Sequence, residues 1–129
     1  MKIQLEVRDY ECDVQGIVNN ANYLNYLEHA RHKFLLAHSI DFVALSKEGR
    51  DLVVREMNLV YHKPLKPDDI FEVETKIKVD GKVKLVFEQE IFRAKEHILS
   101  AKVTGVCVDF NTNKIFKISD ILPLDQLKN

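Results

Sequence analysis

A run of apolar residues at helical spacing, placed just after a glycine turn near the start of the chain, constrains the fold more than any other feature. Apolar side chains recur every three or four positions from residue 23 to residue 35, and this spacing predicts an amphipathic helix of about five turns. Asn19, Asn20 and Asn22 can each cap its first turn, because an asparagine side chain accepts hydrogen bonds from otherwise unpaired backbone NH groups. Such a helix needs a large partner, and the rest of the chain has too few helical segments for a bundle. A sheet is therefore expected to cover it.

Alternating apolar and polar residues in the rest of the chain predict that sheet. The expected strands cover residues 3–7, 52–62, 71–79, 83–91, 99–107 and 114–118. Asp80 and Gly81 form the signal of a two-residue type I′ hairpin, and turns are also expected at 94–97 and 111–113. Short helices are predicted between Ile40 and Gly49 and, capped by Ser119, over residues 120–127. Short connections make neighbouring strands antiparallel. The predicted fold class is therefore α+β, in a single domain over residues 1–129.

Charge and apolar pattern exclude several classes of function. Nineteen Lys and Arg residues are balanced by twenty Asp and Glu residues, so the formal charge of −1 offers no positive surface to nucleic acid. No apolar run approaches the ~20 residues that a membrane span needs. The first fifteen residues are also unlike a signal peptide, so a cytoplasmic location is expected. Cys12 and Cys107 lie far apart and form no CxxC or Cys/His spacing, so no disulfide, metal site or cofactor is expected.

Residues that could carry chemistry gather between Tyr10 and Arg31. Asp13 precedes Gly16, which permits a sharp turn before the helix. The unpaired NH groups and the dipole of a helix amino end can hold a polarised carbonyl oxygen. A carboxylate beside them can attack a substrate or activate a water molecule. Asp13 fits equally well as a turn residue that caps its own loop, so these residues alone leave both roles open.

This stretch resembles the hotdog-fold thioesterases of the 4-hydroxybenzoyl-CoA thioesterase type. The matching residues are Tyr10, Glu11, Asp13, Gly16, Val18, Asn22, Tyr23, Glu28, Ala30 and Arg31, with further matches at Tyr61, Pro64, Leu65, Asp69 and Gly81. The resemblance covers essentially the whole chain. It implies a long central helix wrapped by an antiparallel sheet, and homodimers or homotetramers with active sites between subunits. It also implies metal-free hydrolysis of acyl-CoA thioesters.

The resemblance implies roles for individual residues as well. Asp13 takes the place of the family's catalytic carboxylate, and the backbone NH of Asn20 that of the donor that polarises the thioester carbonyl. Substrate contacts are expected from Gly16, Asn19, Asn20 and Tyr23, and contacts to the CoA phosphates from Lys82 and Lys84. Similar plant acyl-carrier-protein thioesterases have a histidine where this chain has Ile17, and some bacterial acyl-CoA thioesterases have one where it has Asn20. The chemistry here is therefore left to the carboxylate and the helix start.

Other side chains of the predicted helix are expected to be structural. Glu28 and Arg31, three positions apart, suit a surface or interface ion pair. Tyr23 and Tyr26 are expected to pack in the core. His29 and His32 lie toward the polar face of the predicted helix and are expected to be solvated. No histidine is expected to be catalytic.

Two other functions stay open at this point. An acyl-thioester dehydratase or hydratase of the same fold usually employs a histidine in the helix-entry region, where this chain has Ile17. A non-catalytic acyl-CoA binding domain would use the same groove without turnover. Cys12 is a weaker nucleophile candidate, because no histidine accompanies it in the motif. The sequence does not decide acyl chain length, aromatic or aliphatic preference, CoA or acyl-carrier protein, or attack by Asp13 itself or by water.

Overall fold

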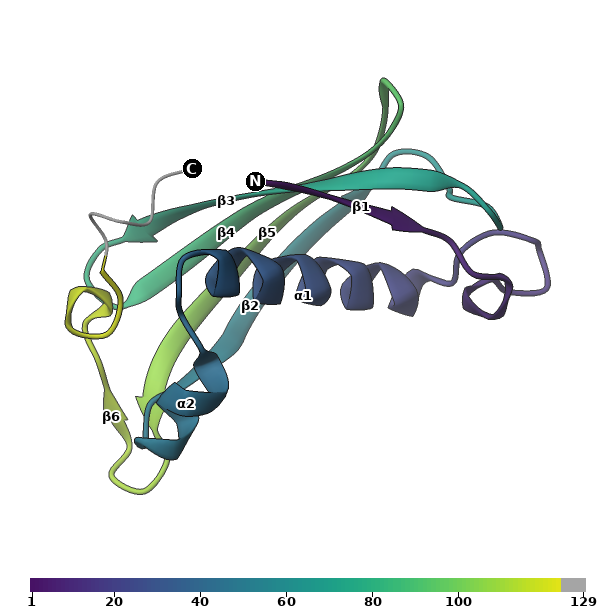
Figure 1. Ribbon diagram of the computed structural model, residues 1–129. Coiled ribbons are helices and arrows are strands. Elements are labelled where there is room, and N and C mark those ends of the chain that lie inside the picture. Colours follow the sequence, from purple (N-terminus) through teal and green to yellow (C-terminus); the bar gives the residue numbers. More distant parts are fainter. Residues whose placement is uncertain (124–129) are drawn as a thin grey trace.

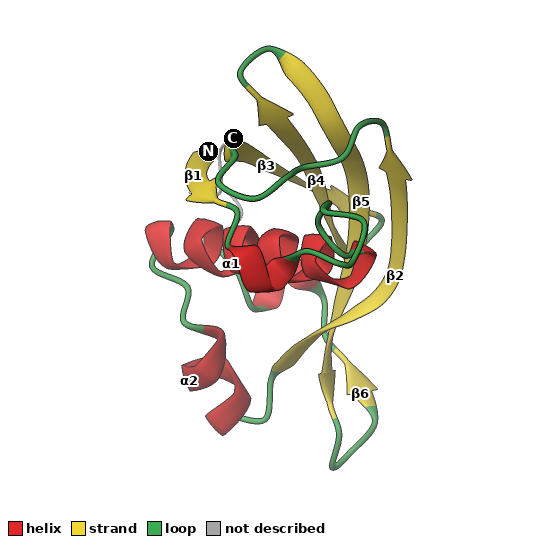
Figure 2. Cartoon of the chain, turned by 90° about the vertical axis from the view of Figure 1, so that its right-hand side faces the viewer, coloured by secondary structure: helices red, strands yellow, loops and turns green. Residues whose placement is uncertain are grey.

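One long helix lies against the concave face of a curved antiparallel sheet, as Figures 1 and 2 show from two directions. The structure is a computed structural model in which residues 1–123 are described. The strands are β1 (Lys2–Glu6), β2 (Asp51–Tyr61), β3 (Ile70–Asp80), β4 (Lys84–Arg93), β5 (Glu96–Asp109) and β6 (Lys114–Ile115). The helices are α1 (Asn20–Ala37) and α2 (Phe42–Lys47), with 3-10 turns η1 (Asp9–Glu11) and η2 (Ile118–Asp120). The predicted α+β arrangement is confirmed.

The order of the strands decides which loops can share a site. The sheet runs β1-β3-β4-β5-β2, every pair is antiparallel, and β6 pairs with the end of β5. Glu6 lies opposite Ile70, whereas Asp80 lies opposite Lys84. The loop that follows β1 is therefore at one end of the sheet and the β3–β4 hairpin is at the other, on the right and left of Figure 1.

Helix α1 begins and ends at residues whose chemistry accounts for it. Asn19 is the N-cap, and its Oδ1 accepts a hydrogen bond from the NH of Ala21 at 2.9 Å. The eighteen residues of α1 make the five turns that the sequence predicts. Leu27 and Phe34 on its buried face have no exposed surface. Leu24, which was expected on that face, is 39% exposed.

A polar cluster lies inside the otherwise apolar core between α1 and the sheet. Gln89 has no exposed surface, and its amide donates to the backbone oxygen of Leu27 at 3.0 Å and to Thr75 Oγ1 at 3.1 Å. Its Oε1 accepts a hydrogen bond from Arg31 at 3.1 Å. Because each of these buried groups has a partner, the cluster fixes how α1 sits on β3 and β4.

Two expectations for side chains on the surface of α1 are wrong. Arg31 is only 8% exposed and reaches under α1 to Gln89, so it does not form the expected surface ion pair with Glu28. Glu28 instead approaches His32, with 3.6 Å between Oε1 and Nε2. His32 is half-buried rather than solvated, because its ring lies 4.4 Å from that of Phe42. Burial lowers the pKa of His32, which favours its neutral form.

Two connections also differ from the sequence-based prediction. Asp80 pairs with Lys84, so the β3–β4 hairpin has a three-residue loop instead of a two-residue turn. Strand β6 covers two residues instead of 114–118, and Ser119 lies inside η2 instead of capping a helix. Of the helix predicted over 120–127, residues 124–127 lie outside the described part of the chain. The short second helix is confirmed as α2, which Asp41 caps and which ends before Gly49 at a φ of 80°.

Candidate active site

The loop between β1 and α1 turns back on itself at Asp13. The NH of Asp13 donates to the backbone oxygen of Ile17 at 2.9 Å, and the NH of Gly16 donates to that of Asp13 at 3.0 Å. Gly16 closes this turn with a φ of 76°, a conformation that glycine adopts without strain. Asp13 is half-buried, and its Oδ1 accepts the NH of Gln15 at 2.9 Å. Asp13 therefore does cap its own loop, while its Oδ2 has no partner within residues 1–123.

A buried carboxylate just before this turn ties the loop to α1. Glu11 is 8% exposed, and its Oε1 accepts hydrogen bonds from the NH of Arg8 at 2.7 Å and the hydroxyl of Tyr26 at 2.9 Å. Its backbone oxygen accepts from the NH of Asn19 at 2.9 Å and from the side-chain amide of Asn22 at 2.8 Å. Burial and the bond to Glu11 raise the pKa of Tyr26, so its hydroxyl stays protonated and donates. Glu11 thus fixes both ends of the loop.

The first turn of α1 contains a backbone NH group that is free to bind an acceptor. Asn19 Oδ1 takes the NH of Ala21, and Asn19 backbone oxygen takes the NH of Asn22 at 2.9 Å. Within the described residues the NH of Asn20 has no hydrogen-bond partner. It lies at the positive end of an eighteen-residue helix, where a partly negative oxygen is stabilised.

A cavity of about 240 Å³ opens at this helix start. Residues 17, 18, 20 and 23 line it from the loop and helix, and residues 61–64 line it from the end of β2. Tyr23 is 2% exposed, and its hydroxyl accepts the NH of Leu65 at 3.0 Å. Burial raises the pKa of Tyr23, so it remains neutral. The cavity brings Asn20 and Tyr23 together. Asp13 does not line it, but its backbone NH is bonded to the oxygen of Ile17, which does.

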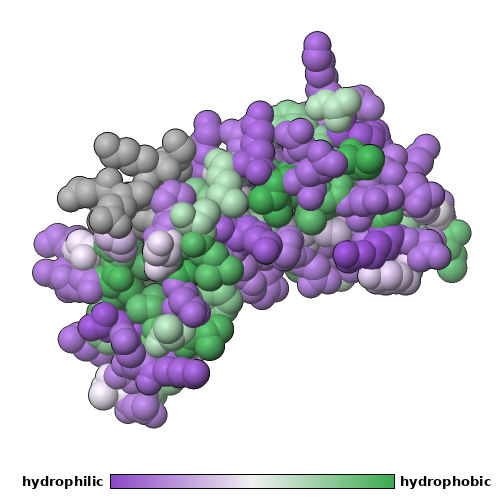
Figure 3. All heavy atoms as spheres, viewed as in Figure 1, coloured by the Kyte–Doolittle hydropathy of each residue, from purple (hydrophilic) through white to green (hydrophobic). Residues whose placement is uncertain are grey.

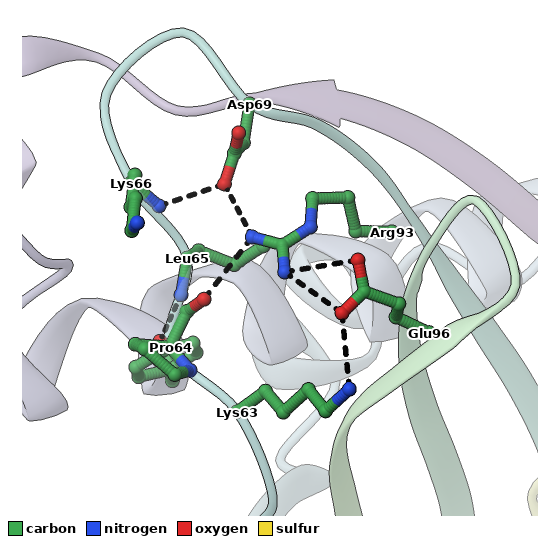
Figure 4. Close-up of polar contacts among 8 residues, drawn as sticks. Lys63, Pro64, Leu65, Lys66, Asp69, Arg93 and Glu96 are labelled. Carbon is green, nitrogen blue, oxygen red and sulfur yellow. Dashed lines mark hydrogen bonds and ion pairs between the residues drawn. The ribbon is translucent and has the colours of Figure 1, made fainter.

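A cluster of charged residues, drawn in Figure 4, contacts Lys63 and Pro64, which line this cavity. Arg93 Nη1 donates to Asp69 Oδ2 at 2.7 Å and to the backbone oxygen of Pro64 at 3.2 Å. Its Nη2 contacts Glu96 at 3.3 Å, and Lys63 pairs with the same carboxylate at 3.1 Å. Hydrogen bonds to Lys63 and Arg93 lower the pKa of Glu96, and the bond to Asp69 raises the pKa of Arg93. Glu96 and Arg93 therefore stay charged at neutral pH.

This wall is joined to the loop that carries Asp13 through the backbone of Leu65. Its NH is held by Tyr23, and its oxygen accepts the NH of Val18 at 2.9 Å. Sequence reasoning missed Arg93 and His62 as part of this region, because Arg93 lies on β4 and His62 directly after β2, both far from the motif in sequence. Pro64, Leu65 and Asp69 were matched to the family and were the signal that pointed to the wall.

The other expected site residues occupy different places. Gly16 and Asn19 shape the turn and the cap and are both exposed. Lys82 and Lys84 lie at the β3–β4 hairpin, at the end of the sheet opposite to Asp13. The helix between the two ends is about 27 Å long, so the structure does not bring these lysines and Asp13 together within one chain.

A second, larger groove runs along β1 and the residues that follow it. Its volume is about 770 Å³, and its lining includes Glu6, Asp9, Glu11 and Asp68 against Arg8. Such an excess of carboxylates repels phosphate groups. This groove is therefore a poor place for a ligand that carries phosphate groups.

Neither the cysteines nor a metal cluster adds to the site. Burial and the neighbouring carboxylates of Glu11 and Asp13 raise the pKa of Cys12, which disfavours the reactive thiolate. Within residues 1–123 no group of three His, Cys, Asp or Glu side chains is arranged to hold a metal ion. No helix in that part of the chain is long and apolar enough to cross a membrane.

Comparison with known proteins gives these features a family. The Thioesterase-like superfamily matches residues 7–123. An acyl-acyl carrier protein thioesterase, chloroplastic, of Arabidopsis thaliana is 41% identical over 110 residues, 84% of this chain and 58% of that protein. The chain thus spans little more than half the length of that relative. Acyl-CoA thioester hydrolase YbgC of Escherichia coli O6:H1 is 37% identical over 100 residues, 77% of this chain and 75% of that protein.

A solved structure agrees with these sequence relatives. The crystal structure of YbaW, a probable thioesterase from Escherichia coli, superposes with a TM-score of 0.84 at 28% identity and covers 100% of this chain and 99% of that one. The long helix against a curved antiparallel sheet is the hotdog fold that the sequence resemblance implied. The chain belongs to the thioesterase-like superfamily.

Proposed function

We propose that this chain hydrolyses acyl-CoA thioesters to a free acid and CoA. The observation that carries this proposal is that the short stretch from Asp13 to the start of α1 holds two groups without partners. Asp13 keeps one carboxylate oxygen free of partners within residues 1–123, and the NH of Asn20 is unpaired at the start of α1. A relative named as an acyl-CoA thioester hydrolase supports the same reaction.

The proposed chemistry uses both groups on one substrate carbonyl. Asn20 NH donates to the thioester oxygen and stabilises the negative charge that develops there, an effect of roughly 2.7 to 4 kcal/mol where such a donor has been removed from enzymes. Asp13 acts by one of two routes. As a general base it takes a proton from a water molecule that attacks the carbonyl carbon; as a nucleophile it forms a mixed anhydride that water then hydrolyses. In both, the carbon–sulfur bond breaks and CoA leaves as the thiolate, which takes up a proton.

The proposal extends to assembly, location and carrier. We propose a homodimer or homotetramer in the cytoplasm. Contacts from Lys82 and Lys84 to the CoA phosphates then require a second subunit, because these lysines lie far from Asp13 in one chain. Relatives are named for CoA and for acyl-carrier protein, so thiol release should be compared with both carriers at matched acyl length.

The test is release of free thiol from a panel of aliphatic and aromatic acyl-CoAs by wild type and Asp13→Asn. An asparagine Oδ1 still accepts the NH of Gln15, so this variant keeps the turn and loses only the charge. We expect an unchanged melting temperature and a loss of at least about 100-fold in kcat. Asp9→Asn, in the same loop, is the matched control and should retain activity. Full activity of Asp13→Asn would refute the role of Asp13.

A second candidate function rests on His62, which lines the same cavity. An imidazole there could exchange protons with the acyl chain of an enoyl-CoA, as a hydratase requires. Addition of water without thiol release, abolished by His62→Asn and unaffected by Asp13→Asn, would favour this reading. Tight binding of CoA esters with no turnover would instead favour a non-catalytic binding domain.

A further inference from the structure

A second cavity, of about 290 Å³, lies between α1, α2 and the sheet. Its apolar wall includes Leu35, Phe42, Leu52 and Phe87, and its polar lining comes from Glu28, Arg31 and His32. Apolar surface also gathers over α2 on the face seen in Figure 3. Leu36 near the end of α1 and Val43 in α2 are each 53% exposed. The volume is at the small end of the range for ligand pockets. We call this space the Arg31 cavity.

The guanidinium of Arg31 has more hydrogen-bond donors than the protein uses. It carries five NH donors, and Nη1 gives one of them to Gln89. Within residues 1–123, Nε and Nη2 have no hydrogen-bond partner, although Arg31 is only 8% exposed. Every fully buried side-chain nitrogen in that part of the chain has a hydrogen-bond partner. Because Nε and Nη2 have none, they are not fully buried, and they reach the open space that Arg31 lines.

Among the charged and titratable side chains that line the cavity, Arg31 is the one that carries a positive charge. Glu28 lies at the polar lining with a side chain 56% exposed to solvent, and it pairs with His32. Burial lowers the pKa of His32, so the imidazole is largely neutral at pH 7. The guanidinium lies 5.9 Å from the centre of the Phe87 ring and keeps two nitrogens without acceptors, so an anion placed there gains charge-assisted hydrogen bonds. The remaining walls are apolar, so the fitting ligand has one anionic group and an apolar body.

We propose that the Arg31 cavity binds a small apolar carboxylic acid as its anion, with the carboxylate on the Arg31 guanidinium and the apolar part against Phe42, Leu52 and Phe87. This site is distinct from the helix start, because Arg31 lies eleven residues after Asn20, about 16 Å along α1. The ligand belongs to the chemical class that hydrolysis of an acyl thioester releases. Binding itself requires no turnover.

Titration calorimetry with octanoate and benzoate tests the proposal, with octanol and benzyl alcohol as uncharged controls. We expect one acid per chain and at least about tenfold weaker binding of each alcohol, since a hydrogen bond to a charged group is lost. Arg31→Gln should lower acid affinity to a similar extent. Glu28→Gln should raise it, because the negative charge beside the site is removed.

Because Arg31→Gln also disturbs Gln89 in the core, a second pair of variants keeps the test decisive. Val54 lines the Arg31 cavity and is 48% exposed, so substitutions there leave the core intact. Val54→Glu should weaken acid binding several-fold relative to Val54→Gln, which has the same size without the charge. Equal binding of acid and alcohol, or equal affinity of these two variants for octanoate, would overturn the proposal.

The outcome is separable from that of the proposed hydrolysis. If the chain hydrolyses acyl-CoA and does not bind octanoate, only the proposed acid binding in the Arg31 cavity is refuted. A chain that binds octanoate through Arg31 and releases no thiol refutes the proposed function alone.

Discussion

Replacing Tyr26 by Phe removes one hydroxyl that joins α1 to the loop carrying Asp13. The ring itself is retained, and it packs 4.8 Å from the ring of Phe71. What is lost is the hydrogen bond of 2.9 Å from the hydroxyl to the buried carboxylate of Glu11. Glu11 keeps its bond from the NH of Arg8 but loses one of two donors to its Oε1.

The size of the effect follows from the charge and burial of Glu11. A hydrogen bond to an ionised group contributes about 1.5 to 3 kcal/mol, and a buried carboxylate cannot replace it readily with water. The free energy of unfolding of Tyr26→Phe should fall by that amount. For a chain of 129 residues this corresponds to a drop of roughly 5 to 12 °C in melting temperature.

Urea titration and thermal unfolding measure this change, and Tyr10→Phe is the matched control. Tyr10 is 74% exposed in the same loop, so losing its hydroxyl should alter stability by no more than about 0.5 kcal/mol. A double-mutant cycle with Glu11→Gln isolates the coupling between the two side chains. The backbone NH of Asn19, which Glu11 accepts, should also exchange faster with solvent. If Tyr26→Phe matches Tyr10→Phe in stability and exchange, Glu11 does not anchor the loop.

Three further changes probe the core, the cavity wall and a buried thiol. Gln89→Leu leaves the buried guanidinium of Arg31 without its hydrogen-bond acceptor, so a urea titration should show a loss of about 3 to 5 kcal/mol. Arg93→Met frees the wall at residues 62–65, so melting temperature and thiol release should both fall, and retention of both would contradict the assigned anchoring role. Burial raises the pKa of Cys107 to about 11 from an ordinary 9.0, so stability should hold below pH 9 and fall as pH rises from 9 to 11. Cys107→Ala should reduce that fall, most clearly between pH 9 and 10, because Tyr23 and Tyr26, whose pKa values are also raised, contribute only above that range.

The sequence predicts the elements of this fold well where the signal is local. The period of α1 and the alternation of β3 and β4 can be read from neighbouring residues, and the structure confirms them. The errors occur where partners distant in sequence decide. Val83 continues the alternation of Leu85 and Phe87, but the pairing of Asp80 with Lys84 places it in the hairpin loop.

The same distinction separates the expected from the unexpected parts of the site. Asp13 and the helix start lie in one short stretch, so their proximity follows from the sequence. Arg31 has the spacing of a surface pair with Glu28, yet a buried partner on β4, Gln89, draws it inward. Arg93 comes from the end of β4, and its relation to the site depends on sheet pairings that a single sequence does not display.

In the structure, the residues of the motif that suggested chemistry largely hold the loop and α1 in place. Glu11 joins the loop to α1 by accepting the Tyr26 hydroxyl, and Tyr23 joins α1 to Leu65 by accepting its NH. The backbone oxygen of Leu65 in turn accepts the NH of Val18 in the loop. These contacts form a closed ring of hydrogen bonds through the loop, α1 and Leu65, and the ring leaves the NH of Asn20 and one oxygen of Asp13 unpaired within residues 1–123. Substitutions in the motif should therefore fall into two groups. Asp13→Asn should remove turnover at constant stability, whereas breaking the ring at Glu11 or Tyr23 should lower stability and turnover together.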